Sequence, residues 1–355
     1  MRAQIGAVLG AWGLAPDLLE TTVEAMVYAD LAGIDSHGLS MLMMYEGGWR
    51  AGKLDLRARP RVVREGPATA LVDAGAGLGH PAGVAGMRLA MEKALAVGVG
   101  AVAVRNSHHF GALGYYAALA PPRGLLGLVT SSTRDVTVVP TRGTAPVLGT
   151  NPLAFAAPAG RNRPFLLDMS TSTAAANKVK VHELNGWPVP GGWVVDERGR
   201  PVTDPGQAMD LVWRRRSAGG GGLTPLGGTA EMASHKGYGL GVMVQLLSST
   251  LSGASFSPVR NRTRPAGSPD DIGHFFLALD PRAFREEGAF EADADLVLDA
   301  LRATPPAEPS LPVLVAGDPE EAARAARTAG TLAVPAPLAE QIRAICGRCG
   351  APYLL

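Results

Sequence analysis

Residues 69–131 decide the fold class: TALVDAGAGLGHPAGVAGMRLAMEKALAVGVGAVAVRNSHHFGALGYYAALAPPRGLLGLVTS. Short, β-rich apolar runs alternate here with helical patterns, which predicts strands at 69–73, 101–105 and 125–131 and helices at about 84–97 and 113–119. This alternation is typical of an α/β protein with a parallel or mixed sheet. Later apolar runs predict further strands at 153–158, 164–168 and 273–280.

Helical patterns flank this region on both sides. Residues 17–33 and 39–49 read as two helices, separated by a turn with the good N-cap residues Asp35 and Ser36. A helix should follow Thr171, and a long buried helix opens at about 236. Two more helices are expected near the C-terminus, one capped by Asp318 and one from about Pro337.

Three segments are loops by composition. They are rich in Gly, Pro and polar residues and cover 188–206, 214–228 and 257–271. Their bulk beside a glycine-rich motif suggests a lid over a binding site.

Composition excludes several classes of protein. The chain has 355 residues, which is enough for two or three lobes with buried cores. Its 33 basic and 32 acidic side chains give a net charge of +1, so no global field recruits nucleic acid or an anionic membrane. We expect small-molecule partners and neither nucleic acid nor a membrane.

The chain ends give two further expectations. No stretch approaches 18 uninterrupted apolar residues, and the N-terminus lacks a cleavage site, so we expect a cytoplasmic protein.

Cys346 and Cys349 are too few for a disulfide framework and lack partners for a zinc site. We interpret them as two thiols at a frayed helix end and expect no metal.

His37, in the segment Asp35-Ser36-His37-Gly38, is the first candidate for chemistry. It follows a predicted N-cap, so the helix dipole should lower its pKa and favour the neutral imidazole. A neutral imidazole can accept an alcohol proton and later return it to a carbonyl oxygen. The alternative is a structural histidine that closes the start of the helix.

Three other polar clusters stand at strand-to-helix junctions. The segment 106–111, NSHHFG, ends a strand at the sheet edge where ligands collect, although at most one of its histidines should face a cleft. The segment 167–172, LDMSTS, offers Asp168 to orient a histidine and hydroxyls to hold ribose or phosphate. In the third, Lys236 opens a helix behind Gly227 and Gly228, which suits an anionic phosphate.

The glycine-rich turn at 75–82 nearly matches a dinucleotide fingerprint. Pro81 removes a backbone N–H there, however, and the next strand ends at Arg105 and Asn106 where an acidic residue should hold the ribose. A tight strand-to-helix turn is therefore favoured over a Rossmann site.

Taken together, these motifs resemble the malate/L-lactate dehydrogenase family, which includes ureidoglycolate, sulfolactate and diketogulonate oxidoreductases and is unrelated to Rossmann-type lactate dehydrogenases. The resemblance runs in order over some 240 residues, through DSHG at 35–38, Tyr45, NSHHFG at 106–111, LGTNP at 148–152, LDMSTS at 167–172, GW with Asp196, DP at 204–205, PLGG at 225–228, HKGYGL at 235–240 and GHFF at 273–276. It implies a non-Rossmann α/β fold with a mixed-sheet cofactor domain and usually a homodimer. Residues 1–70 would pack with residues 285–355 as a helical part, and residues 71–284 would form the NAD(P)-binding and catalytic domain.

The resemblance also implies residue roles. His37 matches the proton donor, His109 a second histidine acting as acid or base, and Asp168 a partner of the catalytic histidine. Contacts to NAD or NADP map to Ser132, Pro164, Phe165, Leu166, Leu167, Asp168, Met169, Ser170, Thr171, Ser172, His235, Lys236, Gly317, Asp318 and Pro319. Substrate contacts are expected from Ser36, Met41, Tyr45, Arg105, Thr150 and Asn151.

The chain departs from this family at two places. Many members have an arginine four residues after the motif histidine to bind the substrate carboxylate, where this chain has Met41. Either Arg105, Arg134 or another cation replaces it, or the substrate is larger or less acidic. The family's Pro-Gly-Glu near the C-terminus is also altered, to Ala316-Gly317-Asp318.

The resulting hypothesis is an oxidoreductase that transfers a hydride between NAD(P)H and a small 2-oxo or 2-hydroxy acid. Two alternatives stay open. One is a reductase of a cyclic imino acid or of a larger, less acidic carbonyl compound on the same fold. The other is a non-catalytic NAD(P)-binding relative.

Overall fold

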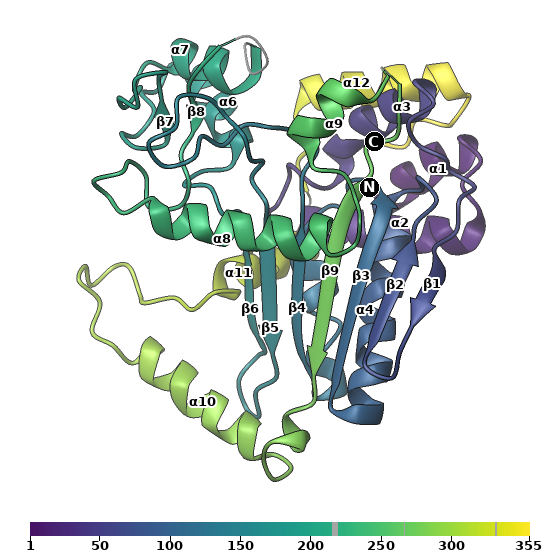
Figure 1. The fold of residues 1–355 in the computed structure, drawn as a ribbon, viewed down its shortest axis with the longest axis vertical. Coiled ribbons are helices and arrows are strands. Elements are labelled where there is room, and N and C mark those ends of the chain that lie inside the picture. Colours follow the sequence, from purple (N-terminus) through teal and green to yellow (C-terminus); the bar gives the residue numbers. More distant parts are fainter. Residues whose placement is uncertain (215–218, 266, 331) are drawn as a thin grey trace.

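A mixed β-sheet forms the centre of the protein. The computed structural model describes residues 1–214, 219–265, 267–330 and 332–355, and within them the sheet has seven strands in the order β1-β2-β3-β9-β4-β5-β6 (Figure 1). β2 and β3 pair in parallel, and the other neighbours are antiparallel. The strands span Arg61–Glu65 (β1), Thr69–Asp73 (β2), Val99–Ser107 (β3), Leu126–Ser131 (β4), Leu153–Ala157 (β5), Phe165–Met169 (β6) and Ile272–Leu279 (β9). The predicted mixed α/β sheet is confirmed.

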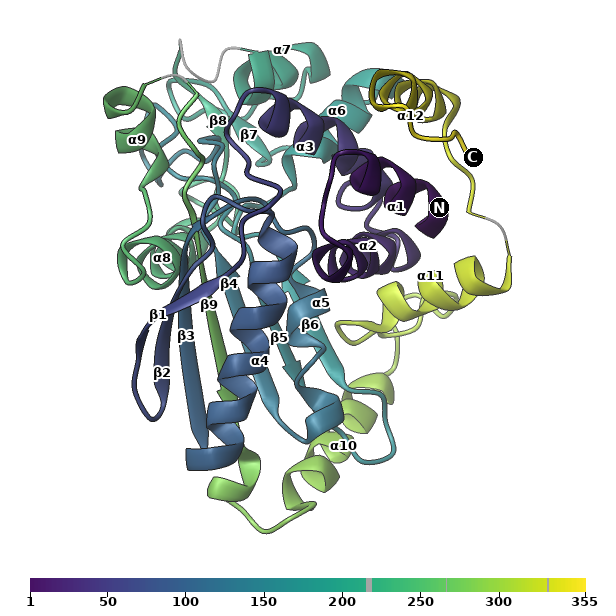
Figure 2. The ribbon, with the colours of Figure 1, turned by 90° about the vertical axis from the view of Figure 1, so that its right-hand side faces the viewer.

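Helix α4 (Gly79–Val97) connects the parallel strands β2 and β3 and covers one face of the sheet (Figure 2). Val102, Val104 and Phe276 are buried in the core between this helix and the sheet. A Cβ on Gly86 would lie 2.7 Å from the Phe276 ring, so glycine permits the close approach. The helix begins at Gly79, before the predicted start at about 84, because the glycine-rich turn folds into its first turn.

Helix α8 (His235–Gln245) crosses the opposite face of the sheet and continues as the π-helical segment η4 (Leu246–Thr250) (Figure 1). Thr130 Oγ1 of β4 and Ser248 Oγ of η4 are 2.7 Å apart. The helix expected at about 236 is confirmed. It is only half buried, however, since Met243 and Leu246 on its outer side are exposed.

Helices from both chain ends pack together beside the sheet. They are α1 (Arg2–Ala11), α2 (Pro16–Leu31), η1 (Leu39–Met41), α3 (Leu42–Arg50) and α12 (Ala336–Cys349). Ile5 and Met26 share a core with Ile342 and Ile345. Cys346 is buried in this core and accepts a hydrogen bond from Gln4 Nε2 at 3.2 Å, so only Cys349 fits the expected thiol at a helix end.

A smaller lobe lies above the β4–β6 side of the sheet (Figure 1). It contains α6 (Ala176–Asn185), β7 (Val194–Val195), α7 (Pro205–Met209), the π-helical segment η3 (Asp210–Arg214) and β8 (Gly222–Leu223). Val138, Val179 and Leu223 form its core. The expected loops at 188–206 and 214–228 therefore carry the short paired strands β7 and β8, and residues 215–218 of the second lie outside the described residues.

The structure corrects several expectations about local structure. The segment 257–271 is not all loop, because α9 (Ser257–Thr263) begins there with a proline in its first turn. The sequence reading also assigned no element to α1, to β1 or to α10 (Ala289–Arg302). Gly317, not Asp318, is the N-cap of α11 (Asp318–Ala329), because the Asp318 carboxylate pairs instead with Arg302 at 2.7 Å.

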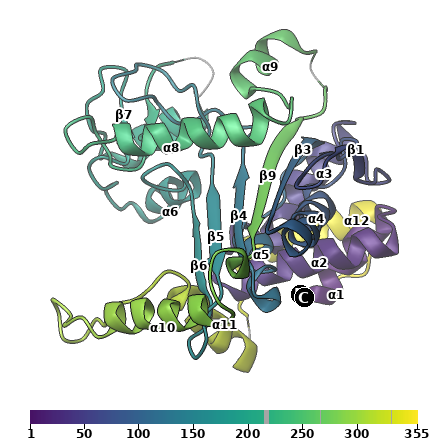
Figure 3. The ribbon, with the colours of Figure 1, turned by 60° about the horizontal axis from the view of Figure 1, so that its bottom comes forward.

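Helix α10 extends away from the helices of the chain ends, beside β6 (Figure 3). Asp295 holds it there by accepting hydrogen bonds from the backbone N–H groups of Arg161 and Asn162 at 2.7 and 2.9 Å. In the part of the chain that the structure describes, no helix is long and apolar enough to span a membrane. The division of the chain at residues 70 and 284 stays a proposal.

Candidate active site

His37 lies in the turn between α2 and η1. Its backbone N–H donates to Ile34 O at 2.9 Å, and its Nδ1 is 2.7 Å from Ser36 Oγ. Burial lowers the pKa of His37 to about 4. The expected cause was wrong, because neither Asp35 nor Ser36 caps a helix: η1 begins at Leu39 with Gly38 as its N-cap. The neutral imidazole therefore comes from desolvation rather than from a helix dipole.

Asp30, at the end of α2, holds this turn in place. Its buried carboxylate accepts a hydrogen bond from Leu39 N at 2.9 Å. A Cβ on Gly38 would lie 1.9 Å from Asp30 Oδ1, so only glycine fits beside it. Arg327 of α11 donates to the Asp30 carbonyl oxygen and to the Asp35 carboxylate. The turn is thus fixed from two sides.

His109 stacks on His37, with ring centroids 5.5 Å apart and an angle of 27° between the rings. Its Nδ1 accepts a hydrogen bond from Gly111 N at 3.3 Å and lies 3.0 Å from the Tyr45 hydroxyl. Burial, reinforced by nearby histidines and Arg134, holds the pKa of His109 well below its usual range. The structure therefore brings together two neutral imidazoles and a phenol from two separate parts of the chain.

Three more histidines lie around this pair, and sequence reasoning did not assign them roles. His80 Nε2 is 3.4 Å from the Tyr45 hydroxyl, and His274 lies 2.9 Å from both Ser107 Oγ and Ser131 Oγ. His108 Nε2 is 3.1 Å from the buried Asp270 carboxylate. In the described parts of the chain, no three metal-binding side chains gather as a possible ion site.

Asp168 lies at the end of β6. Its carboxylate accepts a hydrogen bond from Gly114 N at 2.7 Å, and burial raises its pKa to about 6. Among the described residues, no histidine shares a hydrogen bond with this carboxylate. Its role as partner of the catalytic histidine stays a prediction.

Two of the segments expected to hold the cofactor meet in space. β6 and the start of α11 line a depression of about 340 Å³, formed by Leu166, Leu167, Asp168, Leu314, Val315, Ala316, Gly317, Pro319 and Glu320. Leu166 N donates to Ala316 O at 3.4 Å, and a Cβ on Gly317 would lie 3.3 Å from Leu166. Pro164 is exposed next to the depression, whereas Asp318 turns to Arg302.

Most of the remaining expected cofactor residues lie around the start of α8. Leu226 N donates to Thr171 O at 2.8 Å, which joins the β6 end to the loop before α8. Ser170 and Ser172 bond to each other at 3.1 Å, while His235 and Lys236 are exposed. Ser132 is buried elsewhere and exchanges hydrogen bonds with Gly273 at 3.1 and 3.2 Å.

The expected substrate residues divide into two groups. Ser36 and Tyr45 lie at the stacked histidines, as described above. Met41 packs against the core of the chain-end helices, and Arg105 lies beside Asp73 with Nε and Oδ2 3.3 Å apart. Thr150 and Asn151 are structural in this conformation: the Thr150 carbonyl accepts from Thr171 N, and Asn151 Nδ2 donates to Gly241 O at 2.9 Å.

Asp270 lies in the segment 257–271, which was predicted to be a loop, and it joins several distant parts of the chain. Its carboxylate contacts His108, Arg134 and Arg260, and these basic neighbours lower its pKa to about 2 despite burial. No local signal marks this residue, because its partners come from the segments that follow β3 and β4 and from α9. The sequence did mark Arg134, as one possible replacement for the missing arginine at Met41.

The glycine-rich turn at 75–82 is filled by protein. A Cβ on Gly79 would lie 2.2 Å from His108 O and 2.6 Å from Phe110 Cβ, and His80 and Pro81 are buried. This packing supports the tight strand-to-helix turn over a Rossmann site.

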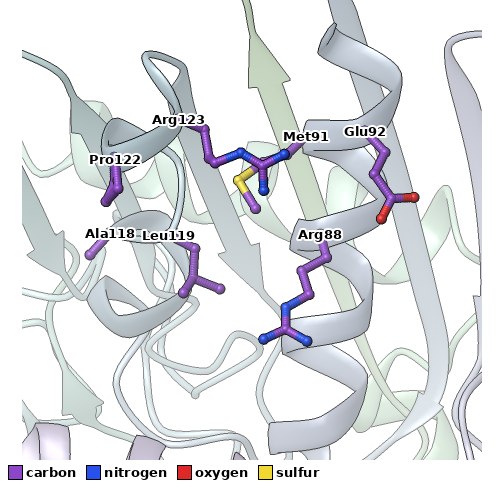
Figure 4. A pocket seen from close by; sticks show the side chains of 7 residues that line it. All are labelled: Arg88, Met91, Glu92, Ala118, Leu119, Pro122 and Arg123. Carbon is purple, nitrogen blue, oxygen red and sulfur yellow. The ribbon is translucent and has the colours of Figure 1, made fainter. Parts of the chain in front are cut away.

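A separate pocket of about 300 Å³ lies between α4 and the segment formed by α5 (Gly114–Ala117) and η2 (Pro121–Arg123) (Figure 4). It is lined by Arg88, Met91, Glu92, Ala118, Leu119, Pro122 and Arg123. None of these residues belongs to the stacked histidine pair or to the expected cofactor and substrate residues. It is therefore distinct from the candidate active site.

Comparison with known proteins identifies the family. The family described as malate/L-lactate dehydrogenase matches residues 1–343. The chain is 37% identical to a malate dehydrogenase of Pyrococcus horikoshii over 298 residues, 84% of this chain and 79% of the relative. It is 33% identical to an L-sulfolactate dehydrogenase of Methanocaldococcus jannaschii over 346 residues, 97% and 94% of the two chains. The crystal structure of malate dehydrogenase from Entamoeba histolytica superimposes with a TM-score of 0.92 at 29% identity, covering 100% of this chain and 97% of that one.

Proposed function

Because the chain belongs to the malate/L-lactate dehydrogenase family, we propose that it oxidises a small 2-hydroxy acid to the 2-oxo acid, and catalyses the reverse reaction, with NAD(P). His37 exchanges the proton of the hydroxyl group. The observation that carries this proposal is the stack of His37 on His109, with both imidazoles held neutral by burial.

The proton chemistry follows from this geometry. A neutral His37 can accept the alcohol proton in the oxidation and, once protonated, return it to the carbonyl oxygen in the reduction. The contact between Ser36 Oγ and Nδ1 fixes the ring and leaves Nε2 for the substrate. His109, whose Nδ1 already faces Gly111 and Tyr45, has its Nε2 left to hold the same oxygen.

The residues present fit a nicotinamide dinucleotide. Gly317 lines the depression between β6 and α11, where an added Cβ would lie 3.3 Å from Leu166 and take up part of the space. Lys236 is exposed in the first turn of α8, so its cationic side chain is available to a phosphate group of the dinucleotide. When bound, NAD(P) supplies the hydride exchange, and either NAD or NADP fits this description.

We also propose that two copies of the chain associate. Leu296, Val297 and Leu301 on α10 are exposed, as are Leu311 and Leu314 further along the chain. A second copy would remove this apolar surface from water. Light scattering should give about twice the chain mass of 36.7 kDa, and a monomer at micromolar concentration would contradict this.

The test of the function is His37→Asn. NADH and NADPH binding, followed by fluorescence quenching, should be unchanged, while kcat falls by roughly three powers of ten or more. The substrate panel contains the 2-oxo acids that correspond to malate, lactate and sulfolactate, together with cyclic imino acids. Binding of the cofactor without turnover of any compound would favour a non-catalytic relative. Turnover of the imino acids alone would favour the imino acid reductase.

A further inference from the structure

The proposed substrates carry a carboxylate next to the reacting carbon, and this charge needs a counter-ion. His37 and His109 are neutral, and the Met41 side chain carries no charge. A carboxylate that leaves water without a cation or strong hydrogen-bond donors costs several kcal/mol. The candidate site therefore requires a cation near the stacked rings.

The segment after β4 carries a candidate cation, Arg134, on a fixed backbone. Ser132 is fixed by Gly273, and the Thr133 hydroxyl donates to Asn151 Oδ1 at 3.3 Å while the Thr133 carbonyl accepts from Ser257 at 2.7 Å. The next residue is Arg134, whose charge acts on His109 and helps lower its pKa. Arg134 thus projects from a backbone anchored on three sides, within electrostatic reach of the stack.

Asp270 connects Arg134 to the histidines by direct contacts. Arg134 Nη1 is 3.4 Å from Asp270 Oδ2, and the same oxygen is 3.1 Å from Nε2 of His108, the neighbour of His109 in the chain. Arg260 also donates to Asp270, to its carbonyl oxygen at 2.5 Å and to Oδ1 at 3.2 Å. Because Asp270 is shared by two arginines, it orients Arg134 without satisfying all of its donors.

The guanidinium of Arg134 has donors available for a ligand. Its contacts with Asp270 and Asp135 are 3.4–3.5 Å long, whereas charge-assisted hydrogen bonds are typically about 2.7–2.9 Å. Its side chain is 30% exposed, against 10% for Arg260. Arg105, the rival cation, is 39% exposed but lies beside Asp73 on the β2 side of β3.

We propose that Arg134 binds the carboxylate of the substrate, with its two terminal N–H groups forming a bidentate pair. This inference rests on the proposed function, because a neutral substrate needs no such clamp. Arg134 would thus bind the substrate carboxylate in place of the family's arginine, because this chain has the uncharged Met41 at that position. An incoming carboxylate would replace the long contacts with Asp135.

The test compares Arg134→Gln and Arg134→Lys with the wild type on a 2-oxo acid and on its neutral amide. Arg134→Gln should lower kcat/KM for the acid roughly 100-fold, through KM more than kcat, and for the amide less than about 3-fold. Arg134→Lys keeps the charge but loses the paired N–H donors of the guanidinium, so an intermediate loss of roughly 10-fold in kcat/KM for the acid is expected. Arg123→Gln, at the separate pocket of Figure 4, is the control and should change neither value.

A binding measurement separates this inference from the proposed function. Oxalate, a small dicarboxylate that cannot be reduced here, is titrated into the wild type and Arg134→Gln with NADH present. Weaker oxalate binding by Arg134→Gln supports the inference even if no 2-oxo acid is turned over. Equal losses on acid and amide, unchanged oxalate binding, or a selective loss in Arg105→Gln instead, would overturn it. If Arg134→Gln does not fold, as judged by circular dichroism, Arg134→Lys gives the same comparison.

Discussion

The turn that carries His37 and the turn before Lys236 contain similar residues but occupy opposite environments. Each combines a histidine and a serine with glycine at or near the start of a helix. The first is held by Asp30 and Arg327 and stacks on His109, whereas His235 and Lys236 of the second are exposed. The difference teaches that burial, rather than the local motif, decides which turn can exchange a proton and which can meet a charged phosphate. Four experiments test this contrast.

The largest effect is expected from Gly38→Ala. The new methyl group would lie about 1.9 Å from the Asp30 carboxylate, so the turn must move or the helices must part. We expect a loss of roughly 4 kcal/mol or more in the free energy of unfolding, measured in urea, together with loss of activity. The matched control is Gly239→Ala in α8, where no atom lies within 4 Å of the added Cβ. Similar free energies of unfolding for the two variants would contradict the proposed difference between the two turns.

The pH dependence of the oxidation should show how dry the His37 turn is. Its pKa of about 4 means that His37 stays neutral at pH 5, so kcat/KM should be nearly constant from pH 7 to pH 5. A histidine with the ordinary pKa of about 6.5 would instead lose roughly 30-fold at pH 5. Because the pKa of Asp168 is raised to about 6, the same profile is measured in Asp168→Asn, where any acid limb that arises from Asp168 is absent. A limb near 6.5 in both proteins would contradict the desolvated site.

Asp30→Asn tests the cost of the buried carboxylate behind the turn. Burial raises the pKa of Asp30 from 3.8 to about 6, so the folded state favours the protonated form. Its stabilising contribution is therefore present at low pH and lost as the pH rises through 6. Between pH 4.5 and 7.5 the wild type should lose about 2 kcal/mol relative to Asp30→Asn, whose side chain does not titrate. Parallel stability curves would refute the raised pKa.

The smallest effect is expected at the exposed turn. Lys236→Gln should weaken NADPH binding roughly 10-fold and leave the kcat at saturating cofactor unchanged. Because Lys236 is exposed to solvent, the difference should shrink as salt is raised from 50 to 500 mM. The cofactor dissociation constant is measured by fluorescence quenching. A lower kcat, or a loss of NADPH affinity that does not depend on salt, would indicate that this turn belongs to the desolvated site.

Local sequence patterns predicted the central strands well, because apolar runs bounded by glycine and proline are themselves the signal. They failed where an element has little apolar content of its own: every residue of β1, Arg61–Glu65, is exposed, and the strand exists through pairing with β2. They failed also at α9, a proline- and arginine-rich helix whose first residue, Ser257, donates to the distant Thr133 carbonyl oxygen.

The site residues also divide into those that the sequence predicted and those that it did not. The sequence marked His37, His109, Tyr45 and Arg134 as separate candidates, and the structure brings the first three into contact. It gave no sign of Asp30 or Asp270, because a buried carboxylate is recognisable only by partners that are distant in the chain. It also attributed the neutral His37 to a helix dipole, which the turn geometry does not supply.

The sequence by itself determined the α/β alternation, the order of the motifs and hence the family, because periodicity and motif order are properties of the chain alone. Only the tertiary structure decided that β9 inserts between β3 and β4, that two imidazoles stack in a desolvated turn and that Asp270 joins Arg134 to His108. These features depend on which distant segments exclude water from one another. Desolvation is a property of the assembled surface, so no single segment of the chain can encode it.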